Sequence, residues 1–270
     1  MEKRKLWGWP AFILRIAVPF LYYAAVVSFL RLLVHAADAA GLRIFPPGSS
    51  QESAAMTVAM ELLLIPVFLL LYREDERRGL RPPDRSRCLP LPVYPASVCG
   101  FLGFYFLVTM VVNLSGLPDL DPAFRRTSEV LEGMKPGLLY VLAGLAAPVM
   151  EELLFRGLLL NRLREKFRAV PCVILQAAMF GLFHWNLTQG ITAFFLGLVL
   201  GHCAVKTRSL LPPALMHGAA NLSGLLLFGQ GEGGLDPALI LFGIPLFSAL
   251  GMGAYLKVMS DLSTDKGDCK

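Results

Sequence analysis

Long apolar runs separated by short charged segments constrain the fold of this chain more than any other feature. Eight runs are long enough, or nearly so, to cross about 30 Å of hydrocarbon as helices. They lie near residues 10–37, 54–72, 92–114, 138–160, 171–187, 190–206, 210–228 and 236–257. Of the 270 residues, 55% are hydrophobic and only 17% are charged, whereas soluble domains are about 45–50% apolar and about 25% charged. The sequence therefore predicts an all-α, polytopic membrane protein with about eight transmembrane helices.

The basic residues fall in short clusters between the apolar runs. With eight spans, the N-terminus, 73–87, 161–168, the turn with Lys206 and Arg208, and the C-terminal tail all lie on one side of the membrane. Because loops rich in Lys and Arg stay in the cytoplasm, both termini are predicted to be cytoplasmic. The net charge of +5 is not gathered into one surface, and no nucleic-acid-binding motif is present. We therefore expect the lipid bilayer as a partner and no nucleic acid.

The fourth apolar run, VMEELLFRGLLL, contains three charged residues. Each ionised side chain at the bilayer centre costs about 2.5–3.5 kcal/mol. Glu152 and Arg156 stand at i and i+4, so on a helix they share a face and can pair. Glu151 is rotated by about 100° from Glu152 and lacks that partner, so it must take up a proton, bind a metal or hold a polarised water. A purely architectural ion pair would explain Glu152 and Arg156 but not Glu151.

The fifth and seventh runs each contain a histidine four residues from a second residue of interest. The fifth reads FGLFHWN, with Phe180 and His184 four residues apart, and the seventh reads LMHGAAN, with His217 and Asn221 four residues apart. On a helix each pair shares one face. A single buried histidine is more often a structural residue than a catalytic one, and Asn186 after His184 could simply cap a helix. Two polar residues on one face of the seventh run are harder to explain by packing.

The glutamate and the two motif histidines are predicted to lie at similar depths in the membrane. At about 1.5 Å per residue, Glu151, His184 and His217 all fall between the cytoplasmic leaflet and the midplane. The sequence thus predicts helices that enclose a buried polar cavity. Such groups can make a water molecule nucleophilic and stabilise an oxyanion. The same glutamate and two histidines could instead ligate zinc.

The three motifs together resemble a known family. EELLFRG, FGLFH and HGAAN, which begin at residues 151, 180 and 217, are similar to the EExxxR, FxxxH and HxxxN motifs of the CPBP intramembrane proteases. This family contains the CAAX prenyl-protein endopeptidases and bacterial proteins linked to bacteriocin self-immunity. The resemblance covers about residues 138–225. It divides the chain into N-terminal transmembrane helices (1–137), a catalytic helical core (138–228), and a last helix with a cytoplasmic tail (229–270).

The resemblance implies roles for a set of catalytic residues, namely Glu151, Glu152, Arg156, His184, His217 and Asn221. Glu151 and His184 would hold and activate the attacking water. The second glutamate and the arginine would organise the site as a pair, and His217 and Asn221 would stabilise the oxyanion. The family has been described both as glutamate-dependent and as metal-dependent. A metal-free mechanism that needs no cofactor is favoured, with zinc bound by Glu151, His184 and His217 as the alternative.

The expected function is that of an intramembrane endopeptidase in the bacterial inner membrane. Its substrates would be membrane-associated or lipidated proteins or peptides, and whether they are prenylated is left open by the sequence. One alternative is a non-catalytic scaffold of the bacteriocin-immunity type, whose function would survive Glu151→Gln. Another is a transporter that uses the buried acid and histidines as a proton relay, although no internal repeat supports it.

Overall fold

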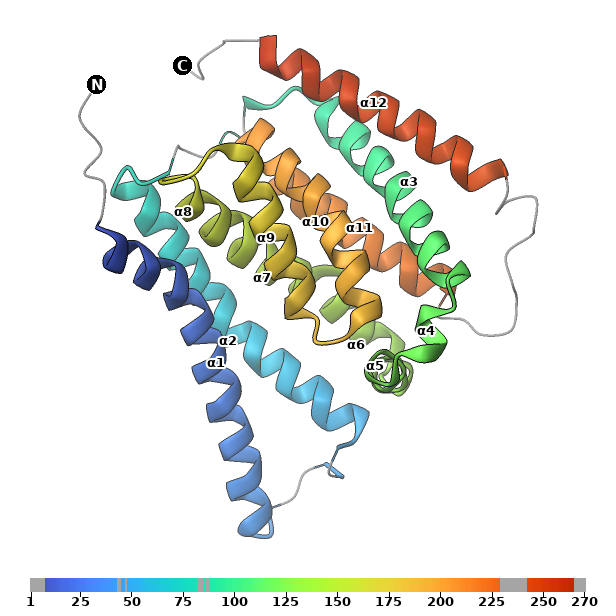
Figure 1. The fold of residues 1–270 in the computed structure, drawn as a ribbon. Coiled ribbons are helices and arrows are strands. Elements are labelled where there is room, and N and C mark those ends of the chain that lie inside the picture. Colours follow the sequence, from blue (N-terminus) through green and yellow to red (C-terminus); the bar gives the residue numbers. More distant parts are fainter. Residues whose placement is uncertain are drawn as a thin grey trace. The chain divides into compact units, whose positions relative to one another are not determined.

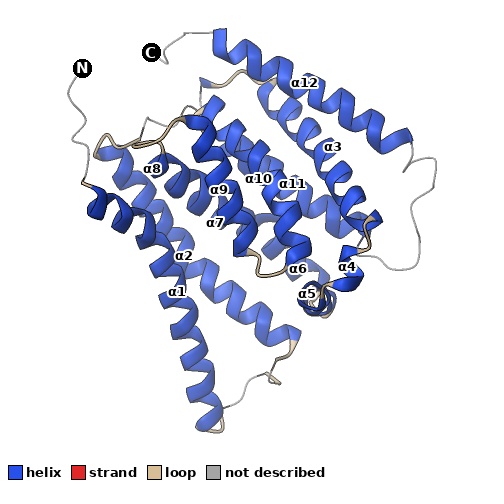
Figure 2. Ribbon diagram, viewed as in Figure 1, coloured by secondary structure: helices blue, strands red, loops and turns tan. Residues whose placement is uncertain are grey.

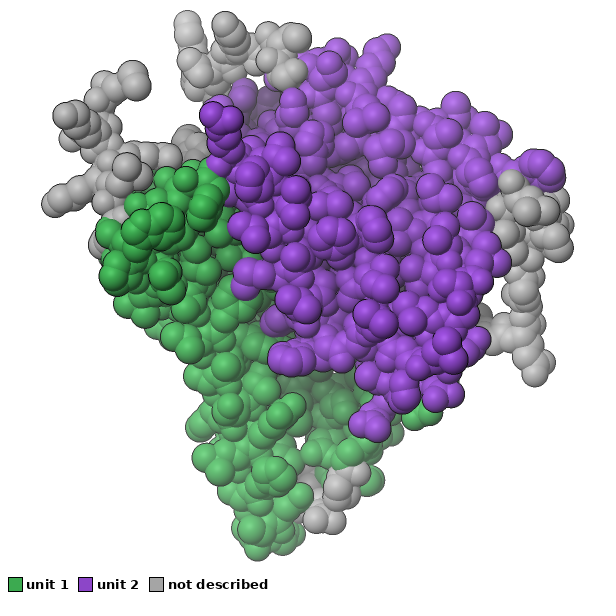
Figure 3. Space-filling view, viewed as in Figure 1, with its two compact units in different colours: residues 1–82, 128–167 green, residues 83–127, 168–270 purple. Residues whose placement is uncertain are grey.

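The computed structural model describes residues 8–42, 45–46, 48–81, 85, 88–228 and 242–264. Within these residues the chain forms helices joined by turns, and no strand is present (Figure 2). The predicted all-α fold is therefore confirmed. By packing, the chain divides into two compact units (Figure 3): unit 1 comprises residues 1–82 and 128–167, and unit 2 comprises residues 83–127 and 168–270. The division at residues 137 and 228 stays a prediction.

Unit 1 combines two long N-terminal helices with one long composite helix. Its elements are α1 (Trp9–Ala39), α2 (Ser50–Arg77), α6 (Pro136–Val141), η2 (Leu142–Ala146), α7 (Ala147–Glu152), η3 (Leu153–Leu160) and α8 (Asn161–Leu163). Ser49 caps α2, because its hydroxyl accepts a hydrogen bond from the amide of Glu52 at 3.2 Å. One face of α2 is buried against its neighbours α1, α7 and η3.

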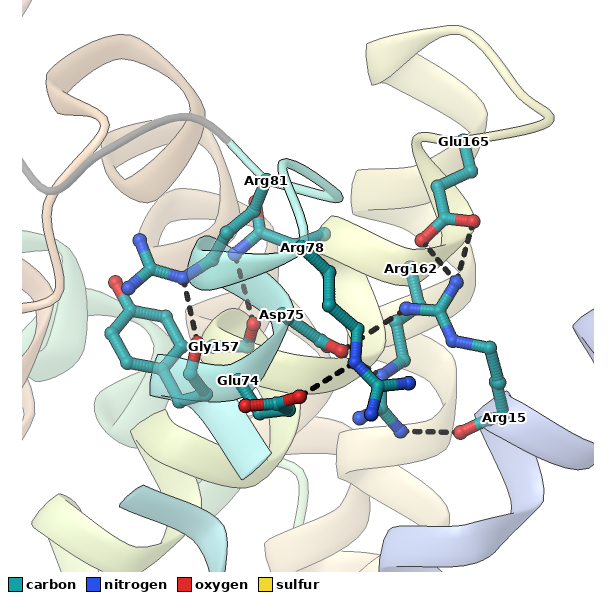
Figure 4. A network of polar contacts seen from close by, with 10 residues as sticks. Arg15, Glu74, Asp75, Arg78, Arg81, Gly157, Arg162 and Glu165 are labelled. Atoms are coloured by element: carbon teal, nitrogen blue, oxygen red, sulfur yellow. Dashed lines mark hydrogen bonds and ion pairs between the residues drawn. The ribbon is translucent and has the colours of Figure 1, made fainter. Parts of the chain in front are cut away.

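A largely buried ionic network joins α1, α2 and the segment around α8 (Figure 4). Arg15 donates to both carboxylate oxygens of Glu165 at 2.8 Å and to Asp75 at 3.1 Å. Arg162 donates from Nε to the other oxygen of Asp75 at 2.8 Å and from Nη1 to the backbone carbonyl of Arg15. Because every charge in the network has an opposite partner, the cost of burying each one is reduced.

Unit 2 is built around α3 (Val93–Leu114), which packs against α10, α11 and α12 (Figure 1). Its other helices are α4 (Leu117–Leu120), α9 (Ala169–Phe183), α10 (Leu187–Thr207), α11 (Leu211–Phe228) and α12 (Ile244–Thr264), and α5 (Pro122–Glu132) crosses the boundary between the units. The core residues come from α3, α10, α11 and α12: Val93, Phe101, Leu196, Leu200, Cys203, Met216, Ala220, Tyr255 and Met259.

Small residues let the helices of unit 2 approach closely. A Cβ atom on Gly103 would lie 2.6 Å from the Cα atom of Ser248, so α3 and α12 touch backbone to backbone there. On α10, a Cβ atom on Gly197 would lie 3.1 Å from Ala177 of α9. The buried Gln176 of α9 also donates to the carbonyl of Gly197 at 2.7 Å. Close contact with interhelical hydrogen bonding is how helices associate in lipid.

Each of the eight predicted runs coincides with a helix in the described residues. In the part of the chain that the structure describes, five helical segments are long and apolar enough to cross a membrane: Trp9–Ala39, Ser50–Arg77, Val93–Leu114, Pro136–Leu163 and Leu187–Thr207. Helix α9 is apolar but shorter. The count of eight spans therefore stays a prediction. The last helix begins at Ile244, and the first six residues of its predicted run, 236–241, lie outside the described residues.

Candidate active site

The helix that carries the two glutamates and Arg156 is not regular. The spacing argument assumes an α-helix over 138–160, but η2 and η3 are π-helical. In η2 the amide of Ala147 donates to the carbonyl of Leu142, five residues earlier, and the following Pro148 has no amide hydrogen to donate. π-helical turns occur frequently at functional sites. The glutamates of α7 thus lie between two wide helical segments.

The predicted ion pair is present at the start of η3. Nη1 of Arg156 donates to Oε1 of Glu152 at 2.8 Å, and the two side chains are 0% and 1% exposed. Asn161 holds the end of the same segment, because its side-chain amide donates to the carbonyls of Arg156 at 3.1 Å and Gly157 at 2.9 Å. The pair and the amide together fix the helix directly after Glu151.

Glu151 is partly exposed, in contrast to the fully buried Glu152. Its carboxylate acts electrostatically on Arg156, on Tyr23 of α1 and on Glu61 of α2. All of these residues belong to unit 1. Glu151 is therefore an accessible acid beside a buried ion pair, as expected for a group that handles protons.

His184 lies at the end of a helix rather than inside one. It forms the C-cap of α9, where the predicted run continued to residue 187. Its Nδ1 is 2.9 Å from the carbonyl oxygen of Phe180. A carbonyl only accepts hydrogen bonds, so Nδ1 carries the hydrogen and the neutral ring presents Nε2 as the acceptor. The helix end thus presents a basic nitrogen.

Phe180 brings the two motif histidines of unit 2 together. Its ring lies 5.0 Å from the His184 ring and 5.7 Å from the His217 ring, edge to face in both cases. Phe180 and His217 are buried, and His184 and Asn221 are partly exposed. The phenylalanine of the FGLFH motif therefore has a structural role, because its ring packs between the imidazoles of His184 at the end of α9 and His217 of α11.

The turn after His184 is held by polar contacts at the start of α10. Asn186 caps α10, because its side chain accepts from the amide of Gln189 at 2.8 Å and donates to the carbonyl of His184 at 3.0 Å. Asp121, in the α4–α5 connection, accepts from the amide of Thr188 at 2.8 Å and from its hydroxyl at 2.9 Å. The backbone hydrogen bond from Thr188 is the main reason that the pKa of Asp121 lies below its usual value, against the opposing effect of desolvation.

We expect Asp121→Asn to lower the thermal unfolding midpoint by about 2–4 °C at pH 7. A carboxyl whose pKa is depressed in the folded protein stabilises it above the pKa of the unfolded chain. That contribution begins to be lost as the pH falls below about 4, and it disappears only below the depressed pKa of the folded protein, so the difference between the two proteins should narrow at low pH. Thermal unfolding of both proteins at pH 7 and pH 3.5 measures this. The exposed Asp119 of α4 supplies the control, and an equal effect of Asp119→Asn would contradict the prediction.

The predicted site residues divide between the two units. Glu151, Glu152 and Arg156 belong to unit 1, and His184, His217 and Asn221 belong to unit 2. In unit 1 Arg156 contacts Glu152, and in unit 2 the rings of His184 and His217 each contact Phe180. Among the described residues, no three His, Cys, Asp or Glu side chains are grouped as metal ligands. The zinc alternative draws its ligands from both units, and it stays a prediction. The free Nε2 of His184 fits a metal ligand as well as a water acceptor.

Sequence reasoning missed two polar residues. Glu61 is a single acid in the run 54–72, whose strong hydropathy outweighs one charge. A search for ionisable residues inside each run would have found it. Asp121 lies in a loop with several acids, and no sequence pattern marks the one that contacts α10.

A comparison with known protein families identifies a relative of the segment that carries the predicted site residues. Residues 134–223 match the family described as type II CAAX prenyl endopeptidase Rce1-like. This segment is an Rce1-like domain. The match confirms the resemblance drawn from the three motifs and contains all six predicted site residues. No curated protein and no solved structure matches the chain. The matched family is a family of proteases, and the long apolar helices inside and outside the matched segment support an integral membrane protein.

Proposed function

We propose that this protein is an intramembrane endopeptidase that cleaves membrane-associated or lipidated substrates, with a prenylated C-terminal CAAX sequence as the first candidate. The observation that carries this proposal is the Rce1-like match, which contains the acidic, histidine and asparagine motifs in order. The structure supports it with a partly exposed acid beside a buried ion pair in unit 1 and two imidazoles on one phenylalanine in unit 2.

In the proposed mechanism Glu151 is the general base. Its carboxylate takes a proton from a water molecule that also donates a hydrogen bond to Nε2 of His184. The resulting hydroxide attacks the carbonyl carbon of the scissile peptide bond. His217 and Asn221 donate hydrogen bonds to the oxyanion of the tetrahedral intermediate. Glu151 then returns the proton to the leaving amine as the C–N bond breaks.

The ion pair has a supporting role in this mechanism. Arg156 neutralises Glu152 and so holds the helical turn that follows Glu151. The proposed reaction needs no metal. In the zinc alternative Glu151, His184 and His217 would hold the ion, which would polarise the water. A chelator distinguishes the two, because a metal-free enzyme keeps its activity after exhaustive treatment with EDTA or phenanthroline.

We further propose that both termini face the cytoplasm of a bacterium and that the protein lies in the inner membrane. The basic segments support this orientation, since all of them fall on one side when eight spans are counted. The catalytic residues then lie between the cytoplasmic leaflet and the midplane. Substrates anchored by a lipid in that leaflet would reach the site without leaving the membrane.

Hydrolysis of a defined peptide tests the proposal. The full chain, reconstituted in liposomes, is given an internally quenched peptide that ends in a farnesylated CAAX sequence, or the same peptide with an unmodified cysteine. We expect cleavage of the farnesylated peptide after the modified cysteine, identified by mass spectrometry, and at least tenfold slower cleavage of the unmodified one. Equal cleavage of the two peptides would show that the enzyme does not recognise the prenyl group. Cleavage of neither would favour a non-catalytic scaffold.

A further inference from the structure

One buried carboxyl group in unit 1 has no part in the mechanism above. Glu61 lies in the middle of α2 and is 3% exposed. Both of its carboxyl oxygens are buried and, among the described residues, neither makes a hydrogen bond. Buried polar atoms nearly always have a partner, so each exception requires an explanation. An ionisable residue inside a membrane helix is costly and by default marks a functional site.

Glu61 faces protein and not lipid. The buried residues of α2 recur at helical spacing, as Ala54, Glu61, Leu64, Phe68, Tyr72 and Asp75. This stripe is the face that α2 buries in unit 1, where it packs against α1, α7 and η3. Leu64 and Phe68, which follow Glu61 on the stripe, are 0% exposed. A leucine at position 61 would fill the same space. Packing therefore does not explain the carboxyl group, and its polar surroundings must.

Glu61 lies on the buried face of α2, and α2 packs against α7, the helix that carries Glu151, whose charge acts on Glu61. The two acids come from different helices, α2 and α7, which pack together within unit 1. The neighbouring cation, Arg156, is engaged by Glu152 at 2.8 Å. Two carboxylates near each other in a medium of low dielectric constant repel. A hydrogen-bond donor between them, such as water, reduces the repulsion and supplies the partner that the oxygens of Glu61 lack.

We propose that Glu61 is a positioning residue of the active site, and that its carboxyl group and that of Glu151 are bridged by one water molecule. The bridge holds the Glu151 carboxyl in the orientation in which it accepts a proton from the attacking water. This role rests on the proposed function of Glu151 as the base. Helix α2 lies outside the Rce1-like match at 134–223. Through Glu61 it would nevertheless contribute to catalysis by positioning Glu151.

Steady-state kinetics on the farnesylated peptide test the role. Glu61→Leu fills the same space without a polar atom, and we expect kcat to fall about tenfold with KM unchanged, since Glu61 does not touch the substrate. Glu61→Gln keeps a group that can bind the water, and it should retain at least half of kcat. The control is Glu52→Gln at the start of the same helix, which should behave as the wild type. Wild-type kcat in Glu61→Leu would overturn the proposal, as would an equal loss in Glu61→Gln and Glu61→Leu.

A second measurement needs no substrate. Thermal unfolding midpoints are compared for the wild type, Glu61→Leu, Glu151→Gln and the double variant. If one water bridges the two groups, the effects are coupled and the double variant departs from additivity by about 2 °C or more. Additive effects would overturn the proposal. Coupled midpoints with a fully active Glu151→Gln would instead reject Glu151 as the base and leave the acidic pair standing.

Discussion

Glu151→Gln is expected to lower the rate of peptide cleavage by about 10²–10⁴-fold, the range that a positioned general base contributes. Glutamine has nearly the same volume and can still hold a water molecule, but it cannot take up the proton. The wild type and the variant are compared in liposomes under single-turnover conditions, so that product release does not mask the chemical step. The variant should accumulate in the membrane at the wild-type level, because Glu151 is partly exposed and the buried Glu152–Arg156 pair stays in place.

A matched control for this variant lies one residue away. Glu152→Gln removes a carboxylate of the same helix but leaves Glu151 in place, so its main effect should be on stability. His184→Ala should resemble Glu151→Gln, because both residues hold the same water in the proposed mechanism. Unchanged cleavage by a folded Glu151→Gln protein would contradict the mechanism and would favour a non-catalytic scaffold or a transporter.

Arg156→Met is expected to destabilise the protein by about 3–5 kcal/mol, the typical cost of removing one partner of a buried pair. The variant leaves Glu152 at 1% side-chain exposure without its 2.8 Å donor. Replacing both residues, as in Glu152→Gln with Arg156→Met, removes the uncompensated charge and should recover at least half of the loss. Thermal or denaturant unfolding in detergent measures all three proteins.

The chain contains its own control for this second prediction. Glu74 and Arg78 form an ion pair with the same i,i+4 spacing, but their side chains are 43% and 59% exposed. Exposed pairs contribute about 0–1 kcal/mol, so Arg78→Met should change stability far less than Arg156→Met. Equal effects of the two variants would show that burial does not decide the strength of the pair.

Sequence reasoning located the helices and the Glu152–Arg156 pair because both follow from local spacing. It placed His184 inside a helix because the predicted run extended to residue 187, with the apolar Leu187 at its end. The chain instead turns at Trp185, which has φ 56°, and Asn186 caps the next helix. The side chain of Asn186 was a visible cap signal, but the left-handed residue before it was not. The π-helical segments were equally hidden, since the spacing argument presupposes 3.6 residues per turn.

The acid on α2 shows a different limit. A span is recognised by hydropathy averaged over many residues, and a single charge changes that average little. The second run was therefore recognised as a span even though it contains Glu61. Whether such a residue is paired depends on which helix packs against it, and this is a tertiary contact that no single sequence reports.

The network of Arg15, Asp75, Arg162 and Glu165 has a consequence for how the chain is made. Its partners are separated by up to 150 positions, so the ribosome must extend beyond Glu165 before the first helix acquires its full set of counter-charges. A nascent chain that stops earlier offers Arg15 the carboxylate of Asp75 but not that of Glu165. We therefore expect the ion pairs of unit 1 to be completed late, after the glutamate-bearing helix has been translated, because Arg162 and Glu165 lie within the segment that matches the Rce1-like family.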